Sequence, residues 1–408
     1  MTERPAHTDR ASTARPWLML AAGVLAQAAG TVFVNGPAFL LPLLHTERGV
    51  PLAQAGLLAS APTLGMVLTL VAWGALADRV GERWVIAGGL ALTALAAVGA
   101  AFSSGYLGLG GFLLLGGMAA ASTNAASGRV VVGWFPRERR GLAMGIRQMC
   151  QPLGVAVAAV AIPPLAASGG IGAAMTLPAV LTGALAVICA VVIVNPPRPT
   201  RPSVATATDN PYRRTGALWR IHTVSMLLVV PQFTISIFGL VWLTGDLGWS
   251  ATVAGLLIGA SQFIGAVGRI GVGVLSDRVG SRMRPLRWVS WAAIAVMVAL
   301  AFGELVPAWL CAGILIVAAM VTVADNGLAY TAVAEIAGPF WSGRALGLQN
   351  TGQFIAASVV GPAVGGLIAL VGYPFAFAAV ALTPAVAIPL LPRADEHAPT
   401  ELRSPVSR

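Results

Sequence analysis

The sequence predicts an all-α membrane protein with twelve transmembrane helices in two pseudo-symmetric six-helix bundles. Hydrophobic residues make up 57% of the 408 positions and charged residues only 10%, against roughly 25% charged in an ordinary soluble domain. The apolar residues form runs long enough to cross a bilayer, which takes about 20 residues, and two motifs recur half a chain apart. These three observations exclude a soluble enzyme, a nucleic-acid-binding domain and a disordered chain.

Apolar runs bounded by charge, proline or glycine place the spans in order along the chain. In the first half they are expected at 17–44, 53–76, 84–102, 107–134, 142–167 and 172–194. In the second half they are expected at 217–244, 249–274, 286–303, 308–333, 345–369 and 373–392. The predicted regions are a leader at 1–16, a first bundle at 17–194, a Pro- and Arg-rich linker at 195–216, a second bundle at 217–392 and a tail at 393–408.

The distribution of arginine predicts the orientation, because basic loop residues are retained in the cytoplasm. Of the 25 basic residues, Arg48 lies in the opposite loops and three lie more than three residues inside spans, which leaves 21 in termini, loops or span ends on one face. We therefore expect both termini and the linker in the cytoplasm of a bacterium, with the chain in the cytoplasmic (inner) membrane. The net charge of +10 comes from these short loops, so no nucleic-acid partner is expected.

Neither the cysteines nor the histidines indicate catalysis. Cys150, Cys189 and Cys311 fall inside apolar runs at spacings too wide for a metal motif. The four histidines lie at the termini or at span ends, with no nucleophile beside them: His7, His45, His222 and His397. No phosphate-binding loop for ATP is present either. We expect no enzymatic activity, no metal and no cofactor, and energy drawn from an ion gradient.

The two halves of the chain repeat each other. Segment 74–83, GALADRVGER, follows the second span, and GVLSDRVGSR at 273–282 follows the eighth span, 199 residues later. A second match at an offset of 202 residues pairs Asn124 with Asn326, and Gln151 with Gln353. The repeat implies a duplicated six-helix unit, the arrangement expected when two halves rock about a site near the bilayer midplane.

The Gly-x-x-x-Asp-Arg-x-Gly-x-Arg motif of both halves resembles that of the major facilitator superfamily of transporters, over about residues 17–392. In that family this loop tethers helices at the cytoplasmic face, and its Asp meets a helix N-terminus and an Arg near the end of the fourth helix. The resemblance implies a contact between Asp78 and Arg129, which charge and the helix dipole also favour. The gate residues implied are Gly74, Asp78, Arg79, Gly81, Arg83, Arg129, Gly273, Asp277, Arg278, Gly280 and Arg282. For Arg79 and Arg83, a role as a plain positive-inside anchor is an equal alternative.

The polar residues within spans predict which helices face a central pathway. Apart from Arg287 at the start of span nine, spans three, six, nine and twelve hold no Asn, Gln or charge, so we expect them to face lipid, as every third helix does in the family. The amides expected to bind substrate are Gln27, Asn35, Asn124, Gln151, Asn326, Gln349 and Gln353. Gln232 and Gln262 are further polar groups on spans seven and eight. For each amide, interhelical hydrogen bonding is the alternative role.

Four charges lie more than three residues inside predicted spans, where an ionisable group costs at least ~2.5 kcal/mol unless it meets water or a partner. Arg129 lies near a loop, which favours a structural role. Arg147 is either a substrate contact or an anchor. Arg269 and Asp325 lie at similar depths on spans eight and ten, where they could form an ion pair. Such a pair would either only neutralise two buried charges or be broken by a proton or an anionic substrate, and the two alternatives are equal.

An Arg on the eighth helix resembles the monocarboxylate and oxalate carriers, in which this Arg receives a substrate carboxylate. The chain lacks their acidic-Gly-aromatic pattern in the first span and has no basic residue in span eleven, which disfavours a substrate with two carboxylates. The prediction is a monomeric secondary transporter in the lipid bilayer, which moves a small organic anion by alternating access. Arg269 and Arg147 would bind this small-molecule substrate, with a proton as coupling ion at Asp325.

Two other functions remain open. A proton-coupled multidrug efflux antiporter is the main alternative. The run GPAVGG at 361–366 is similar to an antiporter motif of the family, although that motif belongs on the fifth helix. A transporter-like sensor without flux is the third possibility.

Overall fold

The computed structural model describes residues 9–40, 43–44, 50–103, 105–196, 210–214, 216–393 and 395, and within these ranges the chain is helical with no strand. Arg48, the first half of the expected leader, most of the linker and nearly all of the tail lie outside the described residues. The described part holds ten helical segments that are long and apolar enough to cross a membrane.

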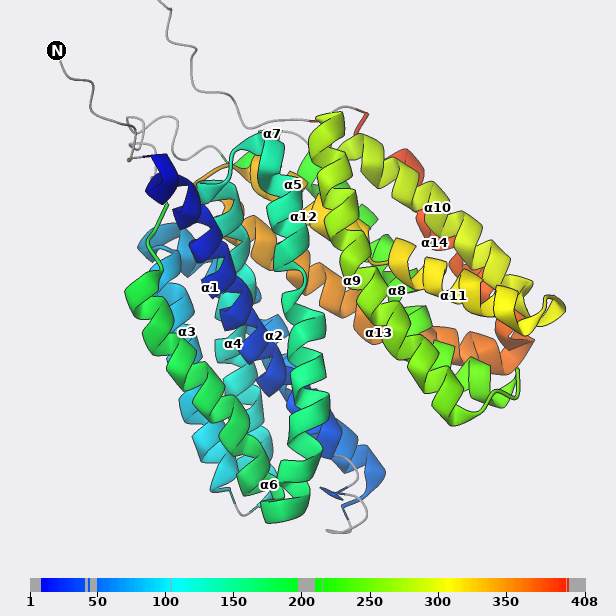
Figure 1. Ribbon diagram of the computed structural model, residues 1–408, viewed down its shortest axis with the longest axis horizontal. Coiled ribbons are helices and arrows are strands. Elements are labelled where there is room, and N and C mark those ends of the chain that lie inside the picture. Colours follow the sequence, from blue (N-terminus) through cyan, green and yellow to red (C-terminus); the bar gives the residue numbers. More distant parts are fainter. Residues whose placement is uncertain are drawn as a thin grey trace, which may run out of the picture.

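The elements of the first half come first in the chain and lie together on the left of Figure 1. They are α1 (Asp9–Asn35), η1 (Gly36–Leu40), α2 (Leu52–Val80), α3 (Glu82–Ala101), α4 (Tyr106–Trp134), η3 (Arg137–Arg139), α5 (Arg140–Arg147) and α6 (Cys150–Val192). Because α1 begins at Asp9, the end of the expected leader is already helical.

The elements of the second half lie together on the right of Figure 1. They are α7 (Pro211–Arg214), α8 (Ala217–Gly245), α9 (Ala251–Val279), α10 (Met283–Ala301), η4 (Gly303–Leu305), α11 (Ala308–Val321), α12 (Asp325–Ala337), α13 (Ser342–Val380) and α14 (Leu382–Leu390).

One of the ten segments, 137–192, has 56 residues and doubles back on itself (Figure 1). The reversal lies at Gly169 and Gly170, and Gly170 has a φ of 67°, which glycine adopts without a Cβ clash. Both ends of the segment reach the same face. The guanidinium of Arg140 donates to the carbonyl oxygen of Phe135 at 3.0 Å, and the neighbouring Trp134 indole donates to that of Val194 at 3.2 Å.

A second segment, 342–390, has 49 residues and reverses at Gly372, whose φ is 79°. With these two reversals, the ten segments make twelve crossings, each near the expected length. The reversals fall where the sequence places the breaks between spans five and six and between spans eleven and twelve. The predicted fold class is confirmed.

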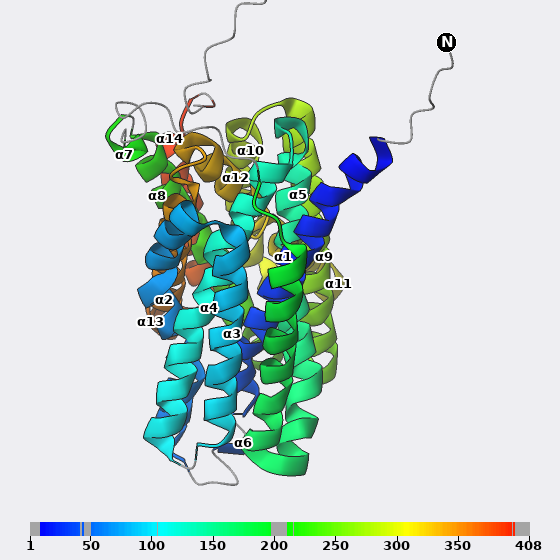
Figure 2. The same cartoon turned by 90° about the vertical axis from the view of Figure 1, so that its left-hand side faces the viewer.

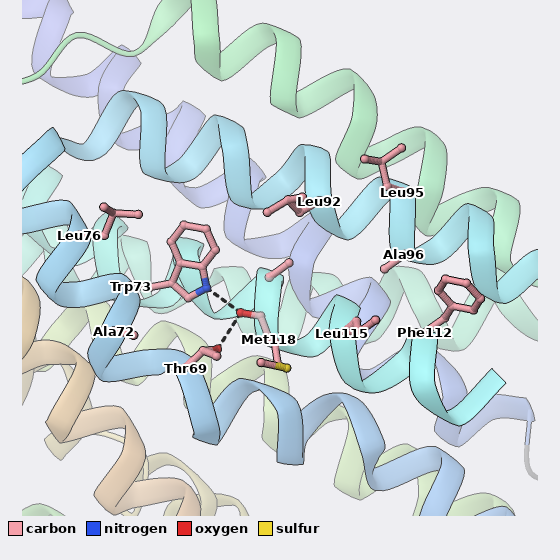
Figure 3. A pocket seen from close by; sticks show the side chains of 11 residues that line it. Thr69, Ala72, Trp73, Leu76, Leu92, Leu95, Ala96, Phe112, Leu115 and Met118 are labelled. Atoms are coloured by element: carbon pink, nitrogen blue, oxygen red, sulfur yellow. Dashed lines mark hydrogen bonds between the residues drawn. The ribbon is translucent and has the colours of Figure 1, made fainter. Parts of the chain in front are cut away.

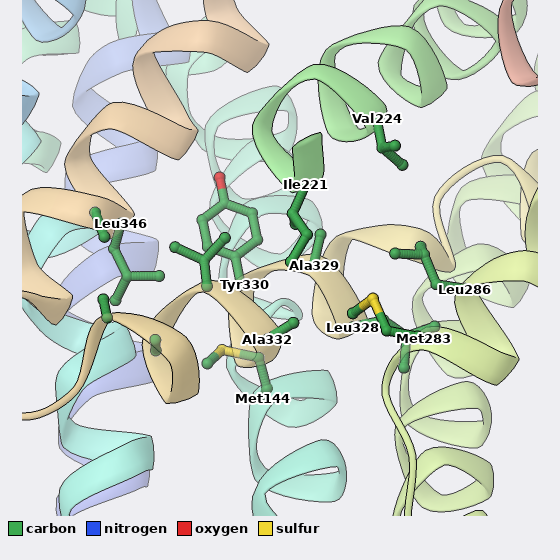
Figure 4. Packing of buried hydrophobic residues seen from close by; sticks show 14 of the residues in the cluster. Met144, Ile221, Val224, Met283, Leu286, Leu328, Ala329, Tyr330, Ala332 and Leu346 are labelled. Carbon is green, nitrogen blue, oxygen red and sulfur yellow. The ribbon is translucent and has the colours of Figure 1, made fainter. Parts of the chain in front are cut away.

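The two copies of the repeated motif lie on one face of the molecule, called the basic face here, with residues 137–141 and 339–344. Figure 2 shows α7 and the start of α1 at this same end of the molecule. An apolar cluster fills the space between the halves beneath it (Figure 4). Met144 of α5 packs there with residues of α8, α10, α12 and α13, all from the second half. The two halves are therefore in contact along the basic face.

Candidate functional site

A cavity of about 840 Å³ lies between the two halves, beyond the apolar cluster. Its polar lining residues are Thr31, Asn35, Ser60, Thr63, Asn124, Gln151, Gln232, Gln262, Arg269 and Ser358. It extends to Ala59 and Gly361, and Ala59 lies roughly 30 Å of helix from the basic end of α2 at Val80. The cavity therefore reaches away from the basic face, in the direction in which the halves diverge in Figure 1.

Arg269 is the one charged side chain among the described residues that line this cavity. It comes from α9 and is 8% exposed. Its Nη1 donates to the carbonyl oxygen of Gln148 at 3.1 Å, and Gln148 belongs to the junction of α5 and α6 in the other half. Its Nε is buried without a hydrogen-bond partner, and Nη2 makes no hydrogen bond with any described residue. A guanidinium N–H is thus available to a ligand in the cavity.

Asp325, at the start of α12, is 1% exposed and does not line the cavity. Within the described ranges, neither of its carboxylate oxygens has a hydrogen-bond partner. The expected ion pair between Arg269 and Asp325, both of them described residues, is not formed in this state, and Arg269 donates to the opposite half. Each charge still acts electrostatically on the other. The structure therefore leaves a buried acid unpaired near an arginine that has another partner.

Arg147 is 1% exposed and lies outside the cavity wall. Its Nε donates to the hydroxyl of Ser127 at 2.8 Å, and its Nη2 donates to the carbonyl oxygen of Asn124 at 3.1 Å. Its guanidinium also lies 5.5 Å from the ring centroid of Tyr330. Of the two predicted roles for Arg147, this geometry favours a structural one.

Gln27 joins the same network and does not line the cavity either. Its Nε2 donates to Asn124 Oδ1 at 2.7 Å, and its Oε1 accepts from Ser127 at 2.8 Å. Among the amides expected in the first half, Asn35, Asn124 and Gln151 do line the cavity.

The amides expected in the second half bond to other side chains and are not among the described lining residues. Asn326 donates to Gln232 Oε1 at 3.0 Å, and Gln353 donates to Asn326 Oδ1 at 2.8 Å. Gln349 accepts from the ring of His222, which also lies 2.9 Å from the hydroxyl of Tyr212. None of Asn326, Gln349 and Gln353 is among the described lining residues, so their expected contact with substrate is not seen in this state.

Gln232 of α8 and Gln262 of α9 line the cavity although they were not expected to bind substrate. The sequence signal was present, because both are polar residues in apolar spans. Phe233 and Phe354 also line the cavity, and nothing in the sequence distinguishes these rings from other aromatic residues in the bundle.

At the basic face, each copy of the repeated motif binds a helix of the other half. Asp78 accepts the backbone N–H groups of Gly343 and Arg344 at 2.9 and 3.0 Å, at the start of α13. Asp277 accepts those of Gly141 and Leu142 at 2.9 and 2.8 Å, at the start of α5. A carboxylate at a helix N-terminus is favourable by charge and dipole.

Arginines complete both contacts. Arg129 forms the expected ion pair with Asp78, and its Nε lies 2.7 Å from Glu82 Oε1. Arg282 lies 2.7 Å from Asp277 Oδ1 and 3.2 Å from Glu335 Oε1. Burial alone would lower the pKa of Arg282, but the two carboxylates outweigh it and hold that pKa above its usual value.

The remaining motif residues are glycines at close contacts, glycines at positive φ, a hydrogen-bonded arginine and two exposed arginines. A Cβ on Gly74 would collide with the carbonyl of Gly343, and one on Gly273 would collide with that of Gly141. The left-handed positions are Gly81 and Gly280, with φ of 104° and 65°. Arg83 donates to the carbonyl of Ala190 at 2.6 Å, within the first half. The side chains of Arg79 and Arg278 are exposed.

A second pocket, of about 540 Å³, lies within the first half among α2, α3 and α4 (Figure 3). Its lining is apolar except for Thr69 and Trp73, and both donate to the carbonyl oxygen of Met118 at 2.7 Å. It therefore offers a ligand neither a charge nor a free side-chain donor among the described residues. The central cavity is the better candidate site.

The chain is similar to known proteins over most of its length. The model of the Major Facilitator Superfamily matches residues 18–359. An uncharacterised MFS-type transporter of Mycobacterium tuberculosis strain H37Rv is 48% identical over 377 residues, which cover 92% of this chain and 84% of that protein.

Solved structures share the fold at low sequence identity. FucP, a transporter of the superfamily in the outward conformation, has a TM-score of 0.73 at 17% identity and covers 91% of this chain and 97% of its own. The human organic anion transporter MFSD10 has a TM-score of 0.72 at 15% identity, with 95% and 100% covered. The proton:xylose symporter XylE has a TM-score of 0.69 at 15% identity, with 92% and 95% covered.

Proposed function

Because the chain belongs to the Major Facilitator Superfamily, and is a multi-pass membrane transporter rather than an enzyme, we propose that it moves a small organic anion by alternating access, coupled to protons. The observation that carries this proposal is Arg269, the one charge among the described lining residues, with an N–H free to bind. A planar guanidinium suits a carboxylate, so a monocarboxylate-like substrate fits best.

The closed basic face determines which side of the membrane the cavity faces in the proposed cycle. Loop charge assigns the basic face to the cytoplasm, together with both termini. The cavity then opens to the outside of a bacterial inner membrane, and the contacts of Asp78 and Asp277 hold the cytoplasmic gate shut. The cavity lies between the halves of one chain, so a monomer is sufficient for transport.

Arg269 and Asp325 supply the proposed coupling. An ionised carboxylate that is buried without a donor is costly, so we assign the transported proton to Asp325 in this state. The bond from Arg269 to Gln148 joins the two halves and must break when they separate at the basic face. Asp325 then releases its proton and pairs with Arg269, which completes the predicted ion pair in the opposite state.

The test is uptake of labelled monocarboxylates into proteoliposomes, with and without an inward proton gradient. The native protein is compared with Arg269→Gln and with Arg284→Gln, a control that removes an exposed arginine of α10. We expect gradient-driven uptake by the native protein and the control, and its loss in Arg269→Gln. Uptake that persists unchanged in Arg269→Gln contradicts the proposal.

Efflux of amphipathic drugs is the second candidate, because Gly361 of the GPAVGG run lines the cavity. Faster loss of cationic dyes from cells that carry the protein, abolished by Asp325→Asn, would favour this function. No carboxylate is found among the described lining residues, which disfavours a cationic substrate.

A further inference from the structure

We infer that the anion is polyhydroxylated, a sugar-acid-like molecule with one carboxylate and several hydroxyl groups along its chain. This inference rests on the proposed function, because it takes the central cavity as the place where the transported anion binds. It follows from the amide groups that the cavity presents in addition to Arg269.

Four lining amides retain hydrogen-bonding groups for a ligand. Gln151 and Gln262 are exposed, and their side chains have no hydrogen-bond partner among the described residues. Gln232 uses Oε1 to accept from Asn326, which leaves its Nε2. Asn35 uses Nδ2 to donate to the Thr31 carbonyl, which leaves its Oδ1. These groups come from α1, α6, α8 and α9, and so surround the cavity from both halves.

The chemistry of these groups matches hydroxyls better than a second carboxylate. A primary amide offers both a donor and an acceptor, and a hydroxyl group can both donate and accept. A carboxylate only accepts, so it could use the N–H groups of Gln151 and Gln262 but would leave their oxygens and that of Asn35 without a donor. A second carboxylate would also lack a cation in a lining that holds only Arg269 among the described charges.

The spacing of Arg269 and Gln262 favours a chain of several carbons. They lie seven residues apart on α9, which places them on the same face and roughly 10 Å apart along the axis. A ligand that contacts both carries a hydroxyl well beyond its carboxylate. Phe233 and Phe354 add apolar surface to the same cavity, against which the C–H groups of a polyol can pack. A two- or three-carbon acid would leave most of these groups facing water.

The experiment measures binding to the full-length protein in lipid nanodiscs. The probes are gluconate, glucose without a carboxylate, hexanoate without hydroxyls, and glucarate with two carboxylates. We expect gluconate to bind about tenfold or more tightly than each of the others, since one charge-assisted hydrogen bond is enough for a factor of this size.

Two variants separate the contribution of the hydroxyl contacts from that of the carboxylate contact. Gln262→Leu should weaken gluconate binding about tenfold and leave hexanoate unchanged. Arg269→Gln should remove the preference for gluconate over glucose. Gln54→Leu, at an exposed position outside the described cavity lining, is the matched control and should bind gluconate as the native protein does.

The outcomes distinguish this inference from the function on which it rests. If hexanoate binds as tightly as gluconate and still depends on Arg269, the hydroxyl inference is wrong and the anion proposal stands. Tighter binding of glucarate likewise overturns the single-carboxylate inference alone. If no anion binds, or if Arg269→Gln changes nothing, the proposed function fails and this inference fails with it.

Discussion

The carboxylate of Asp78, near the end of α2, accepts the backbone N–H of Gly343 at the start of α13, 2.9 Å away. This bond crosses from the first half to the second, and Asp277 makes its counterpart in the reverse direction with Gly141. The duplicated motif thus builds a reciprocal clasp, in which each half caps a helix of the other. Arg129 and Arg282 hold the two aspartates within their own halves.

Breaking one side of this clasp should open the basic face. We expect Asp78→Asn to lose charge-assisted bonds to α13 and to shift the chain toward the state open at that face. Cys150 is fully buried, two residues after Gln148, which accepts a hydrogen bond from Arg269 of the other half, and can report this state. Its rate of maleimide labelling, with Cys189 and Cys311 replaced by serine, should rise in Asp78→Asn.

The control for that experiment is Asp246→Asn, the same change at an exposed aspartate that follows α8. It should label as slowly as the parent protein. Equal labelling of Cys150 in Asp78→Asn and in the parent would show that the clasp does not set the closed state.

The glycines of the clasp allow a second test, based on close approach. A Cβ on Gly273 would collide with the carbonyl oxygen of Gly141, whereas one on Gly271, two residues earlier, meets nothing within 4 Å. Overpacking of this kind costs typically about 1–3 kcal/mol. We expect Gly273→Ala to destabilise the closed basic face and to raise Cys150 labelling, and Gly271→Ala to behave as the parent. Faster labelling in both variants would point to a general loosening of α9 instead.

Arg147 should matter for stability. It is buried, bonds to Ser127 and to the carbonyl of Asn124, and lies over the ring of Tyr330. Arg147→Gln leaves buried groups unsatisfied, so the free energy of unfolding should fall by about 1–3 kcal/mol. The measurement is the thermal midpoint in detergent, with Arg284→Gln as the matched control at an exposed position. A normal midpoint combined with lost anion binding would instead assign Arg147 to substrate.

Local signals in the sequence predict the fold well, because apolar runs fix the crossings. The resemblance of the motif implies the Asp78–Arg129 contact, but nothing in the sequence shows that each aspartate caps a helix of the other half. The expected Arg269–Asp325 ion pair rested on depth along the helices alone, and depth does not show that Arg269 donates to Gln148 of the other half. The repeat also predicts symmetric lining by Gln151 and Gln353.

One residue explains why that symmetry fails. Tyr330 occupies the position that corresponds to Gly128 at the repeat offset of 202 residues. Its hydroxyl lies 2.8 Å from Gln353 Oε1 and 2.6 Å from Asn350 Oδ1. The first half has only a hydrogen atom at this position, so Gln151 remains free to face the cavity while Gln353 bonds to Tyr330 and is not among the described lining residues.

Asp325 provides the sharpest test of coupling, because its side chain has no hydrogen bond to any described residue in this state. Asp325→Asn keeps the shape of the carboxyl group and removes its ability to carry a proton. We expect little change in the thermal midpoint and near-normal exchange of labelled for unlabelled substrate across the membrane, since exchange needs no net proton movement. Accumulation driven by an inward proton gradient should be lost, because the variant can neither bind the proton nor form the ion pair with Arg269 in the opposite state. Gradient-driven accumulation at the native level in Asp325→Asn would place the proton elsewhere, and loss of exchange together with accumulation would assign Asp325 to the transport path itself.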